Sequence, residues 1–205
     1  YRKELIGAKL IATPGCYVTA ATLALRPFVR GGVFHAEGLI VDAASGVSGA
    51  GKALKSSSMF TTVDEDFSAY GLVSHRHTPE MEQEIGGQVL FTPHLAPMNR
   101  GILATCYARP ISVNTTTESL LQVLAEAYKN EKFVVVSEEI PSTKSTQGTN
   151  AVHITARYDA RTGYAIVISA LDNLTKGASG GAVQSANVAL GLNESLGLSA
   201  VGVWP

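Results

Sequence analysis

The strongest constraint on the fold is a pair of patterned segments near the C-terminal end of the chain. Residues 151–158 alternate apolar with polar side chains, and this period of two is typical of a strand with one exposed face. Residues 164–171 form a second apolar run, and residues 159–163 between them (DARTG) are rich in turn formers. The pattern predicts an antiparallel hairpin with one solvent-exposed face.

Further patterned segments occur earlier in the chain. Strand-like runs lie at residues 9–13, 38–44, 88–95, 101–109 and 133–136. Helical spacing is found at residues 18–25, ending near Pro27, at residues 116–129, and at the small-residue run 177–190. Thr115 and Glu118 have the spacing of a capping box for the second of these helices. Many strands and few helices predict an α+β sheet with helices on one face.

Charge and composition exclude several classes of protein. The 205 residues carry 16 Lys and Arg against 17 Asp and Glu, so there is no basic surface typical of nucleic-acid or anionic-membrane binding. No apolar run approaches the ~18 residues of a membrane span, and the N-terminus has neither a secretory signal nor an initiator Met, which suggests a fragment. Two cysteines cannot form a disulfide framework, so a reducing compartment, the cytoplasm or an organelle lumen, is expected.

The two cysteines have different predicted roles. Cys16, in the segment 13–17 (TPGCY), lies between a predicted strand and a predicted helix. Helix N-termini lower the pKa of a thiol and can hold an oxyanion, so Cys16 is a candidate nucleophile. The alternative is a small buried residue at a strand end. Cys106 lies on the apolar side of its predicted strand and is expected to be a core thiol.

Residues 75–80 (HRHTPE) gather two imidazoles, a guanidinium and a carboxylate. A histidine near a thiol can perform acid/base chemistry, and an arginine can bind an anionic substrate. A metal site formed by His75, His77 and Glu80 is disfavoured, because no further ligand cluster has suitable spacing. Plain surface polarity stays open, and His94 could share a site with Arg100.

The segment 45–52 (SGVSGAGK) has the Gly-x4-Gly-Lys spacing of a P-loop. Ala53 stands where Ser or Thr would ligate magnesium, so NTP hydrolysis is disfavoured. A glycine-rich loop near a phosphate or cofactor, or merely a tight turn, remains possible. Asn173, at a strand–helix junction, could bond a planar amide or cap the helix. No Gly-x-Gly-x-x-Gly motif follows a strand, so this chain alone lacks a dinucleotide-binding fold.

Taken together, the motifs resemble the arginine-pathway branch of the semialdehyde dehydrogenase family. The resemblance rests on residues 14–17 (PGCY) with 19–20 (TA), 45–52, 75–80, 91–95 (FTPHL) with 100–102 (RGI), and 172–174 (DNL) with 176–178 (KGA) and Gln184, in that order over nearly the whole chain. Val18 departs from the proline expected at this position. It implies a mixed, largely antiparallel sheet, as in the C-terminal domain of glyceraldehyde-3-phosphate dehydrogenase-like enzymes. It also implies NADPH-dependent reduction of N-acetyl-glutamyl 5-phosphate to the 5-semialdehyde and phosphate.

The resemblance assigns roles to particular residues. Cys16 would attack the acyl phosphate and carry a thioester, and His75 would be its acid/base partner. The implied substrate or phosphate ligands are Tyr70, Arg76, His77, Glu80 and Arg100. The residues implied to lie near the nicotinamide of NADP(H) are Ser45, Gly46, Ser48, Gly49 and Asn173. No metal is implied.

The resemblance also implies an organisation of the whole enzyme. Residues 1–205 would form the catalytic, substrate and dimerisation domain of a homo-oligomer, a dimer or tetramer without nucleic-acid or membrane partners. The N-terminal NADP-binding domain would lie outside this chain, and residues 178–205 would pack toward it. Three alternatives remain: a carrier-bound aminoadipyl-phosphate reductase of lysine biosynthesis, a cofactor-free thiol hydrolase or acyltransferase, and a non-enzymatic assembly surface.

Overall fold

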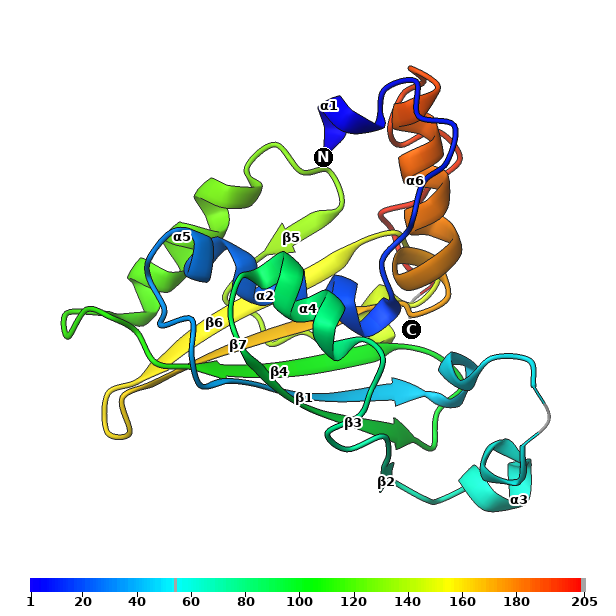
Figure 1. Ribbon diagram of the computed structural model, residues 1–205, viewed down its shortest axis with the longest axis horizontal. Helices are drawn as coiled ribbons and strands as arrows, with labels where there is room; N and C mark the ends of the chain where they lie inside the picture. Colours follow the sequence, from blue (N-terminus) through cyan, green and yellow to red (C-terminus); the bar gives the residue numbers. More distant parts are fainter. Residues whose placement is uncertain (54, 204–205) are drawn as a thin grey trace.

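The computed structural model describes residues 1–53 and 55–203, which are organised around one seven-stranded sheet (Figure 1). The strands are β1 (Leu39–Gly46), β2 (Ser68–Ala69), β3 (Val89–Ala96), β4 (Ile102–Ala108), β5 (Val134–Val136), β6 (Val152–Asp159) and β7 (Tyr164–Leu171). Their order is β2-β3-β1-β4-β7-β6-β5. Within the described chain, four of the six strand pairings are antiparallel, and the β1–β3 and β5–β6 pairings are parallel. This confirms the predicted mixed, largely antiparallel sheet.

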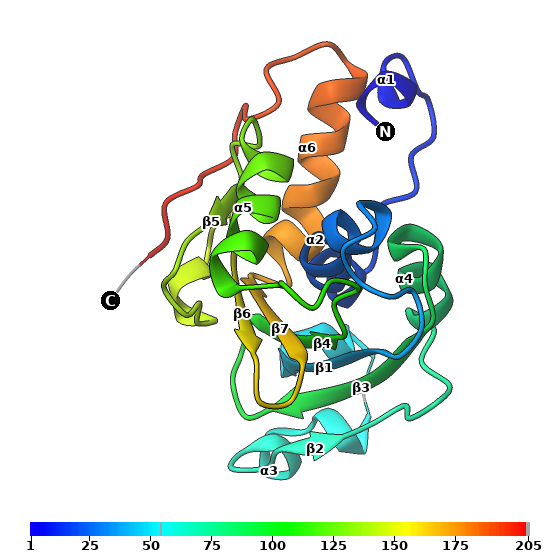
Figure 2. The ribbon, with the colours of Figure 1, turned by 90° about the vertical axis from the view of Figure 1, so that its left-hand side faces the viewer.

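Helices cover one face of this sheet, as predicted (Figure 2). The long central helix is α2 (Cys16–Arg30), flanked by α4 (Thr78–Ile85) and α5 (Thr117–Tyr128). Helix α6 (Gly180–Ala189) continues from the π-helical turn η4 (Thr175–Ser179) and packs near α1 (Arg2–Leu5). Between β1 and β2 the chain forms two 3-10 turns, η1 (Val47–Ala50) and η2 (Ser56–Ser58), and the short helix α3 (Phe60–Val63). A third 3-10 turn, η3 (Lys144–Thr146), precedes β6.

Helix α2 forms because its apolar residues recur at helical spacing and bury one face against the sheet. The residues Tyr17, Val18, Ala20, Ala21, Ala24, Leu25 and Phe28 are all buried in the core. The helix was expected to end near Pro27, but it continues to Arg30. Pro27 has no N–H to donate to the carbonyl of Leu23, and the hydroxyl of Tyr128 donates to that carbonyl instead, at 2.6 Å. This bond from α5 satisfies the oxygen that the proline leaves without its helical partner.

Three other local predictions were also wrong. Residues 9–13 are not a strand, because no strand of the described residues pairs with them, and Leu10 is 94% exposed. The capping box of α5 is formed by Thr116 and Ser119, one residue later than expected. The predicted helix 177–190 begins as the π-helical turn η4 and becomes α-helical at Gly180.

The predicted hairpin is confirmed as β6 paired with β7, turning at Gly163 with φ +72°. Its second face is only partly exposed to solvent. Thr155 on this face is 1% exposed, because residues after β5 cover it and the carbonyl of Ser137 accepts its hydroxyl. Cys106 is fully buried in β4, which confirms the predicted core thiol.

Candidate active site

Cys16 is the first residue of α2 and lies in a pocket of about 470 Å³. Gly15, the N-cap, is in an extended conformation, so the chain enters the helix directly at the thiol. The pocket is lined by Cys16, Tyr17, Gly49, Ala50, Lys55, Ser57, Ser68, Tyr70, His75, Arg76, His77 and Leu95. The structure therefore brings together the predicted nucleophile, the predicted acid/base residue and three of the predicted substrate ligands.

The thiol of Cys16 is not a spontaneously ionised group. Burial raises its pKa above the ordinary value, and the backbone N–H groups of Tyr17 and Cys16 and the charge of Arg76 lower it only in part. The sequence-based expectation of a lowered pKa was thus wrong in sign, although the helix N-terminus acts in the predicted direction. A thiol of this kind needs a base to take its proton before it attacks.

His77 and Glu80 pack against Gly15, directly before the nucleophile. A Cβ atom at position 15 would clash with the imidazole ring of His77, so any larger residue would have to displace that ring. The carboxylate of Glu80 accepts the N–H of Gly15 at 3.2 Å. Burial, with the neighbouring charges of His75 and Arg76, lowers the pKa of His77 to about 4. His77 is therefore neutral at physiological pH and fixes the entry of the chain into α2.

His75 is held in one tautomer. Its Nδ1 accepts the backbone N–H of His77 at 3.1 Å, so the proton of the neutral ring resides on Nε2. Burial, and then the charge of Arg76, lower its pKa. The ring makes edge contacts with Tyr17, Tyr70 and His77 at centroid distances of 5.8, 5.6 and 4.8 Å. Neutral His75 can thus donate a hydrogen bond from Nε2 to a group in the pocket.

A pair of tyrosines forms another wall of the pocket. Tyr70 donates to the hydroxyl of Tyr17 at 3.2 Å, and Tyr17 donates to the carbonyl of His94 at 2.9 Å. Sequence reasoning missed Tyr17, although its position next to Cys16 was a usable signal. The side chain of His94 does not line the pocket; its Nδ1 lies 3.1 Å from Asp42 and its ring stacks on Phe67.

The glycine-rich segment 45–52 does not form a P-loop. The chain passes from β1 into η1, and Asn173 fixes this segment by donating to the hydroxyl of Ser48 at 3.0 Å. The other end of the Asn173 amide accepts the N–H of Gly101 at 2.6 Å. Ser45 donates to the carbonyl of Gly46. Of the five predicted cofactor ligands, only Gly49 lines the pocket of Cys16.

Arg100 is held by a buried carboxylate rather than by the pocket. Its guanidinium lies 2.7 Å from Asp172, which is fully buried, and donates to Thr175 at 3.1 Å. Burial alone would raise the pKa of Asp172, but hydrogen bonds from Gly148 N–H, Arg100 and the N–H groups of residues 174 and 175 lower it overall. Arg100 does not line the pocket of Cys16, so a direct role in substrate binding receives no support from this geometry.

The π-helical turn η4 packs Gly177 directly against Cys16. An added Cβ at Gly177 would lie 2.7 Å from the Cβ of Cys16 and 3.2 Å from its Cα. Sequence reasoning placed this residue in a small-residue helix without recognising the contact. π-helical turns are rare and are frequent at functional sites.

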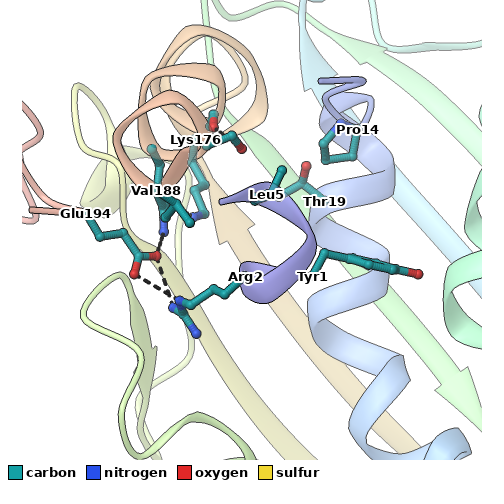
Figure 3. Close-up of a pocket in the computed structure, with 11 residues that line it drawn as sticks. Tyr1, Arg2, Leu5, Pro14, Thr19, Lys176, Val188 and Glu194 are labelled. Carbon is teal, nitrogen blue, oxygen red and sulfur yellow. Dashed lines mark hydrogen bonds and ion pairs between the residues drawn. The ribbon is translucent and has the colours of Figure 1, made fainter. Parts of the chain in front are cut away.

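A second pocket, of about 230 Å³, lies next to this turn, between α1, α2 and α6 (Figure 3). Lys176 donates to Gln184 at 2.7 Å, and burial lowers its pKa to about 8. Gln184 in turn donates to Glu194, which also accepts Arg2 at 3.0 Å (Figure 3). Arg2 further donates to Glu131 at 2.8 Å. This network ties the N-terminal segment to α6.

Two kinds of feature are absent from the part of the chain that the structure describes. Residues 1–53 and 55–203 contain no group of three His, Cys, Asp or Glu side chains that could hold a metal ion. In the same residues, no helix is long and apolar enough to span a bilayer.

Comparison with known proteins gives a consistent result. The family model described as "Semialdehyde dehydrogenase, dimerisation domain" matches residues 16–173. Proteins named N-acetyl-gamma-glutamyl-phosphate reductase from Pelobacter propionicus and Geobacter sulfurreducens are 46% and 47% identical over 213 residues. In both cases the match covers 100% of this chain and 61% of the relative. The chain thus spans about three fifths of the length of these relatives.

Solved structures agree on the fold. Aspartate semialdehyde dehydrogenase II from Vibrio cholerae, in complex with ASA, has a TM-score of 0.70 at 16% identity. The match covers 87% of this chain and 61% of that chain. A probable aspartate-semialdehyde dehydrogenase from Pseudomonas aeruginosa has a TM-score of 0.67 at 17% identity, with 87% of this chain and 62% of that chain covered.

Proposed function

Because the chain belongs to the semialdehyde dehydrogenase family, we propose that its protein is an NADPH-dependent acyl-phosphate reductase of arginine biosynthesis. The substrate would be N-acetyl-glutamyl 5-phosphate, and the products N-acetyl-glutamate 5-semialdehyde and phosphate. The observation that carries the proposal is the single pocket that holds Cys16, His75, Arg76 and His77. The names of the relatives supply the substrate.

Cys16 would act as the nucleophile. An oxygen of the substrate's phosphate takes the thiol proton and the sulfur attacks the acyl carbon. The bond from that carbon to the phosphate oxygen breaks, so that a thioester remains on Cys16 and hydrogen phosphate leaves. The N–H groups at the start of α2 support the negative charge that develops on the sulfur and on the acyl oxygen. His75 would donate a hydrogen bond from Nε2 to the acyl oxygen, since the proton of its neutral ring resides on Nε2.

Arg76 is the most direct candidate for the leaving phosphate. Its charge lowers the pKa of Cys16 and of His75, so it is electrostatically coupled to the reacting groups. Guanidinium groups bind phosphate through two parallel hydrogen bonds. Tyr70, which directly follows β2, would contact the substrate. His77 and Glu80 would position Gly15 and the thiol. Arg100 would support the site through Asp172.

The residues near Cys16 fit the reactive end of NADP(H). Gly49 and Ala50 line the pocket next to the thiol, and a Cβ at position 49 would lie 2.7 Å from Oγ of Ser45. This stretch therefore presents main chain, against which a flat ring can lie closely. Ser45, Gly46, Ser48 and Asn173 would hold it in place. When bound, the cofactor supplies the hydride that reduces the thioester.

The remaining two fifths of the enzyme would bind most of the cofactor. We place the NADP-binding domain outside this chain, with residues 178–205 packing toward it; Trp204 and Pro205 lie outside the described residues.

The sheet face opposite the helices carries half-buried apolar side chains, including Ile40, Leu103 and Ile168. This face would pair with a second copy in a homo-oligomer, consistent with a dimerisation domain. Two free thiols fit a reducing compartment such as the cytoplasm.

Phosphate-dependent reduction of NADP by N-acetyl-glutamate 5-semialdehyde tests the proposal, with the full-length protein and its Cys16→Ser variant. The expected result is activity that requires phosphate and disappears in the variant. Cys106→Ala is the matched control, because it removes the other thiol, which lines no part of the pocket, without burying an unpaired hydroxyl. It should leave the activity in place. No NADP reduction by the wild type would refute the arginine-pathway substrate, and the carrier-bound aminoadipyl substrate would be tested next.

A further inference from the structure

The pocket of Cys16 is strongly biased toward positive charge. Its described lining contains two cationic side chains, Arg76 and Lys55, and no Asp or Glu. Glu80 lies behind the nucleophile and is engaged by the N–H of Gly15. The whole chain has a formal charge of −1, so this concentration of positive charge belongs to the pocket and not to the protein as a whole. It fits a ligand that carries more than one anionic group.

The two cations enter the pocket from different segments. Arg76 precedes α4 and is coupled to the thiol, because its charge lowers the pKa of Cys16. Lys55 lies on the connection between η1 and η2, and Ser57 of η2 and Ser68 of β2 also line the pocket. A phosphate bonded to the carbon that Cys16 attacks must lie beside the sulfur, and this position corresponds to Arg76. Lys55 is then available for a different anion.

Resting on the proposed function, we propose that Lys55 binds the α-carboxylate of the N-acetyl-glutamyl substrate. That carboxylate is at the end of the glutamyl chain opposite the acyl phosphate, and both ends fit a pocket of about 470 Å³. Lys55 is exposed at the pocket wall, where a lysine ammonium on its flexible stem suits a carboxylate that arrives hydrated. The hydroxyls of Ser57 and Ser68 add donors to the same subsite. Lys55 is thereby a specificity determinant and takes no part in the bond-making steps.

The test compares two aldehydes in the full-length protein. One is N-acetyl-glutamate 5-semialdehyde, and the other is 4-acetamidobutanal, which has the same chain without the α-carboxylate. Lys55→Met should raise KM for the first aldehyde by about 10- to 100-fold, the range for loss of one charged hydrogen bond. KM for 4-acetamidobutanal and for phosphate should stay within about twofold, the span of an uncoupled surface change. Lys55→Arg should recover part of the lost affinity.

Lys132→Met is the matched control, because Lys132 is also exposed but follows α5 and lines no part of this pocket. Its kinetics should equal those of the wild type with both aldehydes. An unchanged KM in Lys55→Met, or an equal rise for both aldehydes, would overturn the carboxylate assignment while the wild-type activity stands. Inactivity of the wild type itself toward both aldehydes would overturn the proposed function, and the Lys55 assignment with it.

Discussion

Replacing Gly177 with alanine tests whether the π-helical turn η4 positions the nucleophile. The new Cβ would lie 2.7 Å from the Cβ of Cys16, whereas carbon atoms in contact are about 3.5 Å apart or more. The turn and the start of α2 must therefore separate by about 0.8 Å, the difference between these two distances. Neither group is the end of a flexible side chain, since the added carbon also lies 3.2 Å from the Cα of Cys16. We expect overpacking to cost about 1–3 kcal/mol of unfolding free energy.

The same displacement should affect activity. A misplacement of about 1 Å can cost roughly 100-fold in rate, so Gly177→Ala should lower kcat/KM by about 10- to 100-fold. Ala178→Ser is the control, because this exposed neighbour adds one atom to the same turn without facing Cys16. Urea unfolding gives the free energy of unfolding of each variant. Steady-state kinetics give kcat/KM, and the rate of alkylation of Cys16 shows whether the position of the thiol has changed. Wild-type kcat/KM and wild-type alkylation of Gly177→Ala would refute the role assigned to η4.

Three further outcomes follow from strained and buried groups. Val73 has φ +54°, a conformation that costs a β-branched residue about 1–2 kcal/mol, so Val73→Gly should raise the urea midpoint; a lower midpoint would contradict the strain. Asp172→Asn leaves Arg100 without its carboxylate and should destabilise by about 3–5 kcal/mol. Because the pKa of Asp172 is lowered in the folded state, its contribution is full above the ordinary carboxyl pKa and is lost as pH falls through the folded value. The free energies of unfolding of the variant and the wild type, measured from pH 7 to 3, should approach each other as the pH falls. A constant difference between them would count against this linkage. Iodoacetamide should label Cys16 in the native protein, whereas Cys106, whose pKa burial raises to about 12, should react only after unfolding; equal labelling by peptide mass mapping would contradict the buried position of Cys106.

Much of the sheet could be predicted because its strands carry local patterns. The alternation in residues 151–158 and the apolar run in 164–171 have one consistent solution, the β6–β7 hairpin. The extent of α2 could not be predicted, because the hydroxyl of Tyr128 that satisfies the Leu23 carbonyl before Pro27 comes from a residue 105 positions away. Tertiary contacts of this kind leave no local signal in the sequence.

The candidate site shows the same division. The motif residues Cys16 and His75 share a pocket, as their chemistry predicted. The sign of the Cys16 pKa shift depends on how deeply the fold buries the thiol. Asn173 bonds to Ser48, and Arg100 pairs with Asp172, through contacts between segments that are distant in the sequence. Motif spacing carries no information about these contacts, so the sequence alone could not place these side chains relative to the pocket.

Trapping the thioester on Cys16 tests the central claim most directly. The full-length protein would be incubated with N-acetyl-glutamate 5-semialdehyde and NADP in the absence of phosphate, so that oxidation proceeds but the acyl group cannot be released. Mass spectrometry of the acid-quenched, pepsin-digested protein should find an N-acetyl-glutamyl adduct on the peptide containing Cys16, and added phosphate should remove it. An active enzyme with no adduct at Cys16, or with the adduct on Cys106, would contradict the account.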